Sequence, residues 1–69
     1  MVYHVYFKFG FWRIRQEEPA RSLDYSLKAK DEAIGKARRY ASAVDGTLIV
    51  HNEDESIEFI ENYPDTIFL

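Results

Sequence analysis

The chain has 69 residues, no cysteine, 16% aromatic residues and a formal net charge of −3. This length supports one domain with a small core, and the lack of cysteine excludes a disulfide framework or a thiolate metal site. No apolar run approaches the ~18 residues that a membrane span needs. We therefore expect a soluble, cytoplasmic protein that has no membrane partner.

Charge is distributed unevenly along the chain. Residues 1–39 contain all nine Lys and Arg with five acidic residues, a net charge of +4. Residues 40–69 contain seven acidic residues and no Lys or Arg, a net charge of −7. Such an asymmetry is typical of a partner surface, and it also allows two ends of one fold, or two copies of it, to attract each other.

The N-terminal segment predicts a β-hairpin. Apolar and polar side chains alternate with a period of two over residues 2–9 and again over residues 11–15, with Gly10 between them. This period, carried by aromatic and β-branched residues, is typical of strands, and the glycine favours a tight turn. Residues 16–28 have no clear period and contain Pro19, so we expect a loop there.

Residues 30–44 predict a helix with a single apolar stripe. The stripe consists of Ala33, Ile34, Ala37, Tyr40, Ala41 and Val44. This spacing places the six side chains on one face, and the alanines allow close approach to a sheet. Gly46 predicts a helix stop in the left-handed conformation. Gly35 costs about 1 kcal/mol relative to Ala, which either close packing or an exposed position would explain.

Two more strands are predicted at residues 47–51 and 56–63, before Pro64 ends ladder pairing. The result is one domain over residues 1–69 of the α+β class: ββαββ, a four-stranded antiparallel sheet with the helix on one face. We expect the first strand to lie between the second and the third. The sheet residues predicted beneath the helix are Tyr3, Val5, Phe7, Trp12, Ile14, Leu48, Val50, Ile57 and Phe59. The apolar tail Ile67–Leu69 is expected to cover a core edge or to enter a dimer contact.

Several landmarks resemble domain of unknown function family 2188, a family of small bacterial proteins. They are YHV at residues 3–5, WRI at 12–14, KDEAI at 30–34, the spacing of Ala37 and Ala41, and LIVH at 48–51. The resemblance implies a ββαββ domain and no established activity. The chain departs from the family at Ala29, where a capping Ser or Thr is usual, and at Asp54-Glu55, where Asp-Gly is usual.

The stretch HNEDES at residues 51–56 raises the question of a metal site. Zinc sites draw on two or more His or Cys ligands, and the other histidine in the chain is His4. If the first and third strands are neighbours, His4 and His51 both point away from the helix and can approach each other. The favoured interpretation is a polar turn between two strands. We therefore predict no metal site and no cofactor.

The sequence predicts no enzyme and no catalytic residues, because it contains neither a thiol nucleophile nor a glycine-rich phosphate loop. The sheet face away from the helix is the predicted interaction surface: His4, Tyr6, Lys8, Phe11, Arg13, Arg15, Ile49, His51 and Ile60. Glu58 is expected on the same face. A partly apolar open face favours a second copy or another protein as partner. Aromatic residues interleaved with Arg and Lys support the alternative, a weak single-stranded nucleic-acid binder.

Overall fold

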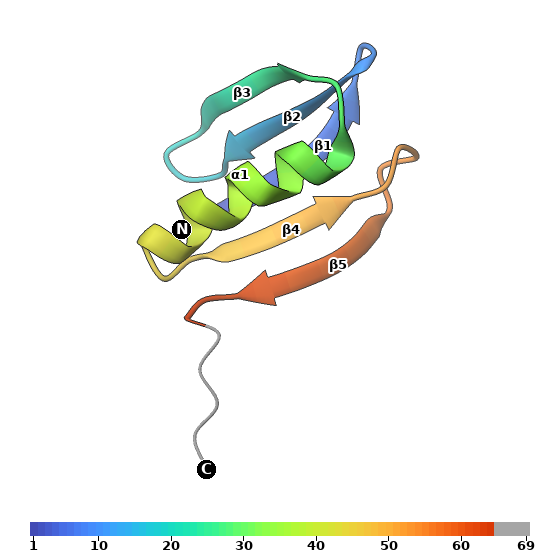
Figure 1. Cartoon of the computed structure of the whole chain (residues 1–69). Helices are drawn as coiled ribbons and strands as arrows, with labels where there is room; N and C mark the ends of the chain where they lie inside the picture. Colours follow the sequence, from blue (N-terminus) through green and yellow to red (C-terminus); the bar gives the residue numbers. More distant parts are fainter. Residues whose placement is uncertain (65–69) are drawn as a thin grey trace.

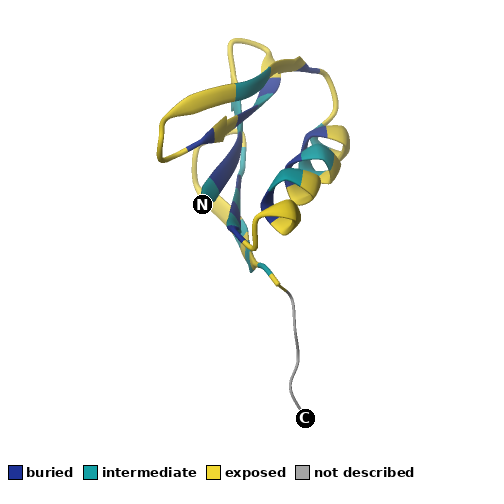
Figure 2. Ribbon diagram, turned by 90° about the vertical axis from the view of Figure 1, so that its left-hand side faces the viewer, coloured by how far each residue is buried: buried dark blue, intermediate teal, exposed yellow. Residues whose placement is uncertain are grey.

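The computed structural model describes residues 1–64, which form one helix and one five-stranded sheet (Figure 1). In chain order the elements are β1 (Val2–Lys8), β2 (Phe11–Gln16), β3 (Arg21–Leu27), α1 (Lys30–Ala43), β4 (Thr47–His51) and β5 (Ile57–Asn62). The strand order is β3-β2-β1-β4-β5. Helix α1 lies across one face of the sheet (Figure 2). The α+β class is confirmed, whereas the tail Ile67–Leu69 lies outside the described residues.

The segment predicted as a loop contains β3, an edge strand that runs antiparallel to β2. The pairing of β2 with β3 is irregular on both sides of Ile14. Leu23, Tyr25 and Leu27 alternate with polar residues, a strand signal that the prediction did not use. The irregular pairing separates burial from this alternation, because Leu27 is buried whereas Tyr25 is 64% exposed. The prediction of a loop was therefore wrong, and Leu27 at the end of β3 belongs to the buried core.

Strands β1 and β4 are neighbours, as predicted, but they are parallel rather than antiparallel. The extra strand explains the difference. Three antiparallel strands precede α1, so β3 runs in the same direction as β1, and the helix returns the chain to β4 in that direction. The sheet is therefore mixed, and the prediction of four antiparallel strands was wrong.

The core lies between α1 and the face of the sheet that it covers. Ala33, Ala37 and Ala41 are fully buried, so the helix backbone lies close to the strands. The largest side chains without solvent exposure are Ile14, Leu48, Val5 and Val50, all on the sheet. Most of the predicted core is confirmed. Ile57 is the exception, because an irregularity after Val50 pairs it with His51 and leaves it 54% exposed.

The two ends of α1 differ in how their backbone groups are satisfied. Ala29 occupies the N-cap position and forms no side-chain capping bond. At the other end, Asp45 adopts the left-handed conformation with φ of 53°, and the Gly46 amide donates to the Ala41 carbonyl at 2.8 Å. The sequence predicted that Gly46 adopts the left-handed conformation, and this was wrong because Asp45 adopts it instead. A Cβ at Gly46 would lie 2.5 Å from the Met1 carbonyl oxygen, so close approach requires the glycine.

Basic residues of α1 bind carboxylates on both edge strands. Arg38 donates two hydrogen bonds to Glu61 of β5, at 2.9 and 2.8 Å. Lys30 pairs with Glu58 of β5, and Lys36 lies 3.4 Å from Asp24 of β3. These ion pairs join the helix to the two edge strands of the sheet, in addition to the packing contacts of the core.

Candidate functional site

The nine residues of the predicted interaction surface share the sheet face opposite α1, called the open face below. The strand register establishes this placement. His4, Tyr6 and Lys8 of β1 lie opposite Arg15, Arg13 and Phe11 of β2. Ile49 of β4 lies opposite His4 on one side and Ile60 of β5 on the other. Figure 2 shows α1 on one side of the sheet, and no helix of residues 1–64 covers the other.

The β1–β2 side of the open face is basic and aromatic. We call Lys8, Arg13 and Arg15 the basic half. The Arg15 guanidinium lies over the Tyr6 ring at 5.8 Å from its centroid. Lys8 and Arg13 lie 5.2 and 5.4 Å from the centroid of Phe9, and Arg13 Nε donates to the Lys8 carbonyl at 2.9 Å. The cations are therefore held against aromatic rings.

Phe9 is a member of this cluster that sequence reasoning missed. The alternation over residues 2–9 places it on the same side of the strand as Tyr3, Val5 and Phe7, yet it is 79% exposed. Its φ of 54° and the positive φ of Gly10 place both residues in the hairpin turn, where the chain leaves the strand pattern. Gly10 immediately after Phe9 is the signal that could have identified it.

The β4–β5 side of the open face is aliphatic and ends in an acidic turn. Ile57 and Ile60 are 54% and 52% exposed. Glu58, predicted on this face, instead pairs with Lys30 of α1, because the irregularity after Val50 shifts the strand pattern. That prediction was wrong, and the open face carries less negative charge along β5 than the sequence suggested.

The turn between β4 and β5, Asn52–Ser56, is called the acidic turn. Asp54 accepts hydrogen bonds from the amide and hydroxyl of Ser56, at 3.1 and 2.6 Å. The Ser56 hydrogen bonds hold the pKa of the Asp54 carboxyl below its usual value. Glu55 adopts a positive φ of 74°, a conformation that glycine adopts most readily. Glycine is the usual residue at this position in domain of unknown function family 2188, which the sequence resembles. The predicted polar turn is confirmed.

His4 and His51 meet on the open face. His4 Nδ1 lies 2.9 Å from His51 Nε2, the ring centroids are 5.1 Å apart and the ring planes differ by 20°. His4 Nε2 lies 2.8 Å from a carboxylate oxygen of Glu17, and His51 Nδ1 lies 3.2 Å from the Glu55 carbonyl oxygen. The sequence predicted the approach of the two histidines, conditional on neighbouring strands.

Glu17 is the member of this network that sequence reasoning did not identify. It follows β2 directly, and its amide donates to the Val2 carbonyl at 2.8 Å, which holds it beside the start of β1. The hydrogen bond with His4 lowers the pKa of the Glu17 carboxyl, and partial desolvation opposes this effect. The ionised carboxylate is therefore the favoured partner of His4.

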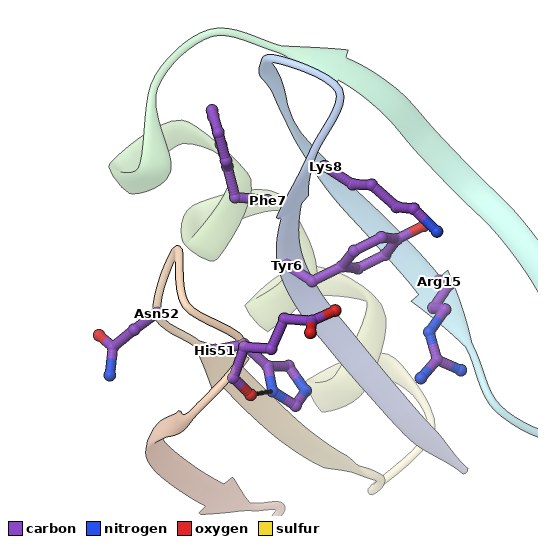
Figure 3. A pocket seen from close by; sticks show the side chains of 7 residues that line it. Tyr6, Phe7, Lys8, Arg15, His51 and Asn52 are labelled. Atoms are coloured by element: carbon purple, nitrogen blue, oxygen red, sulfur yellow. Dashed lines mark hydrogen bonds between the residues drawn. The ribbon is translucent and has the colours of Figure 1, made fainter.

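A shallow pocket of about 240 Å³ opens beside His51. Its lining residues are Tyr6, Phe7, Lys8, Arg15, His51, Asn52 and Glu55. Figure 3 shows His51 near the Tyr6 ring, with a dashed line for the hydrogen bond to the Glu55 carbonyl. The mixed polar lining is suited to solvent or a small polar ligand.

No family model, curated protein or solved structure matches the chain. The resemblance to domain of unknown function family 2188 stays a prediction that rests on the residues quoted above. Within residues 1–64, no helix has the length and apolar character needed to cross a membrane.

Proposed function

We propose that this domain is a non-enzymatic, cytoplasmic interaction module, and that a second copy of the chain docks on its open face. The observation that carries the proposal is the combination of exposed apolar residues with opposite charges at the two sides of one face. Phe11, Ile57 and Ile60 are all exposed there. Apolar surface of this kind is typical of a contact area.

The topology makes the open face complementary to itself. Because β1 and β4 are parallel, the β1–β2 turn and the acidic turn lie at the same end of the sheet (Figure 1). A two-fold axis that runs parallel to the strands, above the open face and between β1 and β4, would place the basic half of one copy over the acidic turn of the other. The contact is reciprocal, as a two-fold interface requires, and opposite charges would fix its register.

Sedimentation or light scattering over a range of concentrations tests this proposal. We expect the mass to rise from monomer to dimer, and the dimer to weaken with added salt. Lys8→Glu and Glu53→Lys should each weaken the dimer, and the double variant should restore it. Arg39→Glu, the same charge reversal on the exposed side of α1, is the matched control. A monomer at all concentrations, or equal losses in the control, would contradict the proposal.

A second candidate function is the binding of single-stranded nucleic acid by the basic half. The cations held over Tyr6 and Phe9 favour it, since stacked bases and phosphates are bound by such arrangements. Titration with labelled single- and double-stranded oligonucleotides at two salt concentrations tests it. Binding should favour single strands, fall steeply with salt and be reduced by Arg15→Gln. No binding at low salt rejects this candidate.

A further inference from the structure

His4 and His51 present two ring nitrogens to each other from adjacent parallel strands. The residue opposite His4 in β4 is Ile49, so His51 is the next residue along β4 on the same face. The inner nitrogens, His4 Nδ1 and His51 Nε2, are 2.9 Å apart, and the ring planes differ by 20°. His4 is only 8% exposed, so its ring position is fixed by its surroundings.

The outer nitrogens of both rings face oxygen atoms that can only accept hydrogen bonds. His4 Nε2 faces the Glu17 carboxylate, and His51 Nδ1 faces the Glu55 backbone carbonyl. Each outer nitrogen therefore carries the ring proton, and a neutral imidazole then has a lone pair on its inner nitrogen. Two lone pairs that face each other at this distance repel, and a cation between them removes the repulsion.

We propose that His4 and His51 form a binding site for a divalent transition-metal ion such as Zn²⁺, Ni²⁺ or Cu²⁺. A carboxylate or a backbone carbonyl on the outer nitrogen is the usual support for a metal-binding histidine, because it fixes the tautomer and the ring orientation. Both histidines have such a support. Every contributing group belongs to one chain, so the site does not depend on the dimer proposed above.

The geometry requires a small adjustment. Zinc binds histidine nitrogens at roughly 2.0–2.1 Å with tetrahedral angles, which corresponds to a separation of about 3.3 Å between two ligand nitrogens. The inner nitrogens must therefore move apart by about 0.4 Å, and a rotation of the partly exposed His51 ring provides this. Imidazole ligands select zinc, copper and nickel over magnesium and calcium, which prefer oxygen.

The protein supplies two ligands to this site. Within residues 1–64, no three His, Asp or Glu side chains are grouped closely enough to hold a metal ion together. The remaining coordination positions would be taken by water molecules. We therefore expect an open, exchangeable site and modest affinity rather than a structural zinc site on which folding depends.

A proton is the competing occupant. One added proton between the inner nitrogens would convert the repulsion into a hydrogen bond and leave all three contacts of the network satisfied. If the two histidines bind only a proton, added metal would change neither the Tm nor the ring resonances. Proton and metal are thus distinguishable by titration with metal at mildly alkaline pH, where protons compete least.

The experiment combines thermal unfolding and NMR of the full chain with Zn²⁺ or Ni²⁺, with Mg²⁺ as the matched control ion. An ion that binds only the folded state raises the Tm progressively with its concentration. We expect this rise with Zn²⁺ and Ni²⁺ and not with Mg²⁺, and we expect Zn²⁺ to shift the ring resonances of both histidines. Sedimentation of the same samples separates binding within one chain from metal-driven association.

Variants assign the effect to the site. His51→Gln, at a partly exposed position, should fold and lose the response to metal. Glu17→Gln should keep the ligands and weaken metal binding by roughly 10–100-fold, since it changes only the support of His4. Unmoved ring resonances with excess Zn²⁺, or an undiminished response in His51→Gln, would overturn the proposal.

Discussion

The two faces of the sheet contain similar residue types, but one face is buried beneath α1 and the other is exposed. The covered face packs aliphatic residues such as Ile14 and Val50 against the alanines of α1 and leaves them without solvent exposure. The open face also carries isoleucines, but they lie on its β4–β5 side, next to the histidine pair and apart from the cations and aromatic rings of β1 and β2, and Ile60 stays 52% exposed. The comparison shows that apolar content alone does not identify the core. Coverage by α1 decides whether an isoleucine is buried and stabilises the fold or stays exposed and available for contact.

The largest expected effect separates the two faces directly. Ile14→Ala on the covered face should cost about 2–5 kcal/mol in the free energy of unfolding, because it leaves a cavity in a fully buried site. Ile60→Ala removes the same atoms from the open face and should cost less than about 1 kcal/mol. Denaturant unfolding of both variants at low protein concentration measures the difference. Equal losses would mean that the two faces do not differ as described.

A smaller effect, an increase in the free energy of unfolding, is expected at the N-terminus of α1 on the covered face. Ala29 has no side chain able to cap the helix, so Ala29→Ser should stabilise the fold by about 1 kcal/mol. The hydroxyl would accept a hydrogen bond from a free amide of the first turn. The Tm and the midpoint of denaturant unfolding should both rise. Ala29→Val, which adds bulk without an acceptor, is the control and should give no gain.

The smallest expected effect concerns the ion pair that holds α1 to β5. The hydrogen bonds from Arg38 lower the pKa of the Glu61 carboxyl, and desolvation opposes them. The folded pKa lies below the unfolded value of 4.5, so the stabilisation is present above that value and is lost as the pH falls through the folded pKa.

Glu61→Gln should therefore cost roughly 0.2–1 kcal/mol at neutral pH, and the cost should disappear in acid. Stability curves at several pH values measure this change. Glu53→Gln removes the same charge from the acidic turn and, at low protein concentration where the dimer does not form, should change stability by no more than about 0.5 kcal/mol. An equal cost of Glu61→Gln at all pH values would contradict an electrostatic origin.

The sequence was most informative where a period was unbroken. The helix, β1, β2 and β4 were predicted to within a residue or two at each end, because their side chains alternate or repeat with the expected spacing. Strand β3 and the direction of β4 were missed for one reason. The alternation of Leu23, Tyr25 and Leu27 is short and follows the Pro19 segment, so β3 was taken for a loop, and without β3 the helix appears to connect antiparallel strands.

The candidate site was predictable in its main parts. The alternation in β1, β2 and β4 placed the histidines and the basic residues on one face. Glu17 could not be assigned from its pattern, because it follows the end of β2 and is brought to His4 by a backbone hydrogen bond to Val2. Phe9 and Glu58 were misplaced where a turn and an irregular pairing interrupt the strands.

The most direct test of the difference between the two faces is the dilution of isotopically labelled protein, followed by amide chemical shifts. Contacts between copies change the shifts of the residues that form them, so the spectrum reports which face is used. We predict that the shifts of Lys8, Arg13, Ile49 and the acidic turn depend on concentration, whereas those of the exposed side of α1 do not. Shifts that are independent of concentration, or changes centred on α1, would contradict the account.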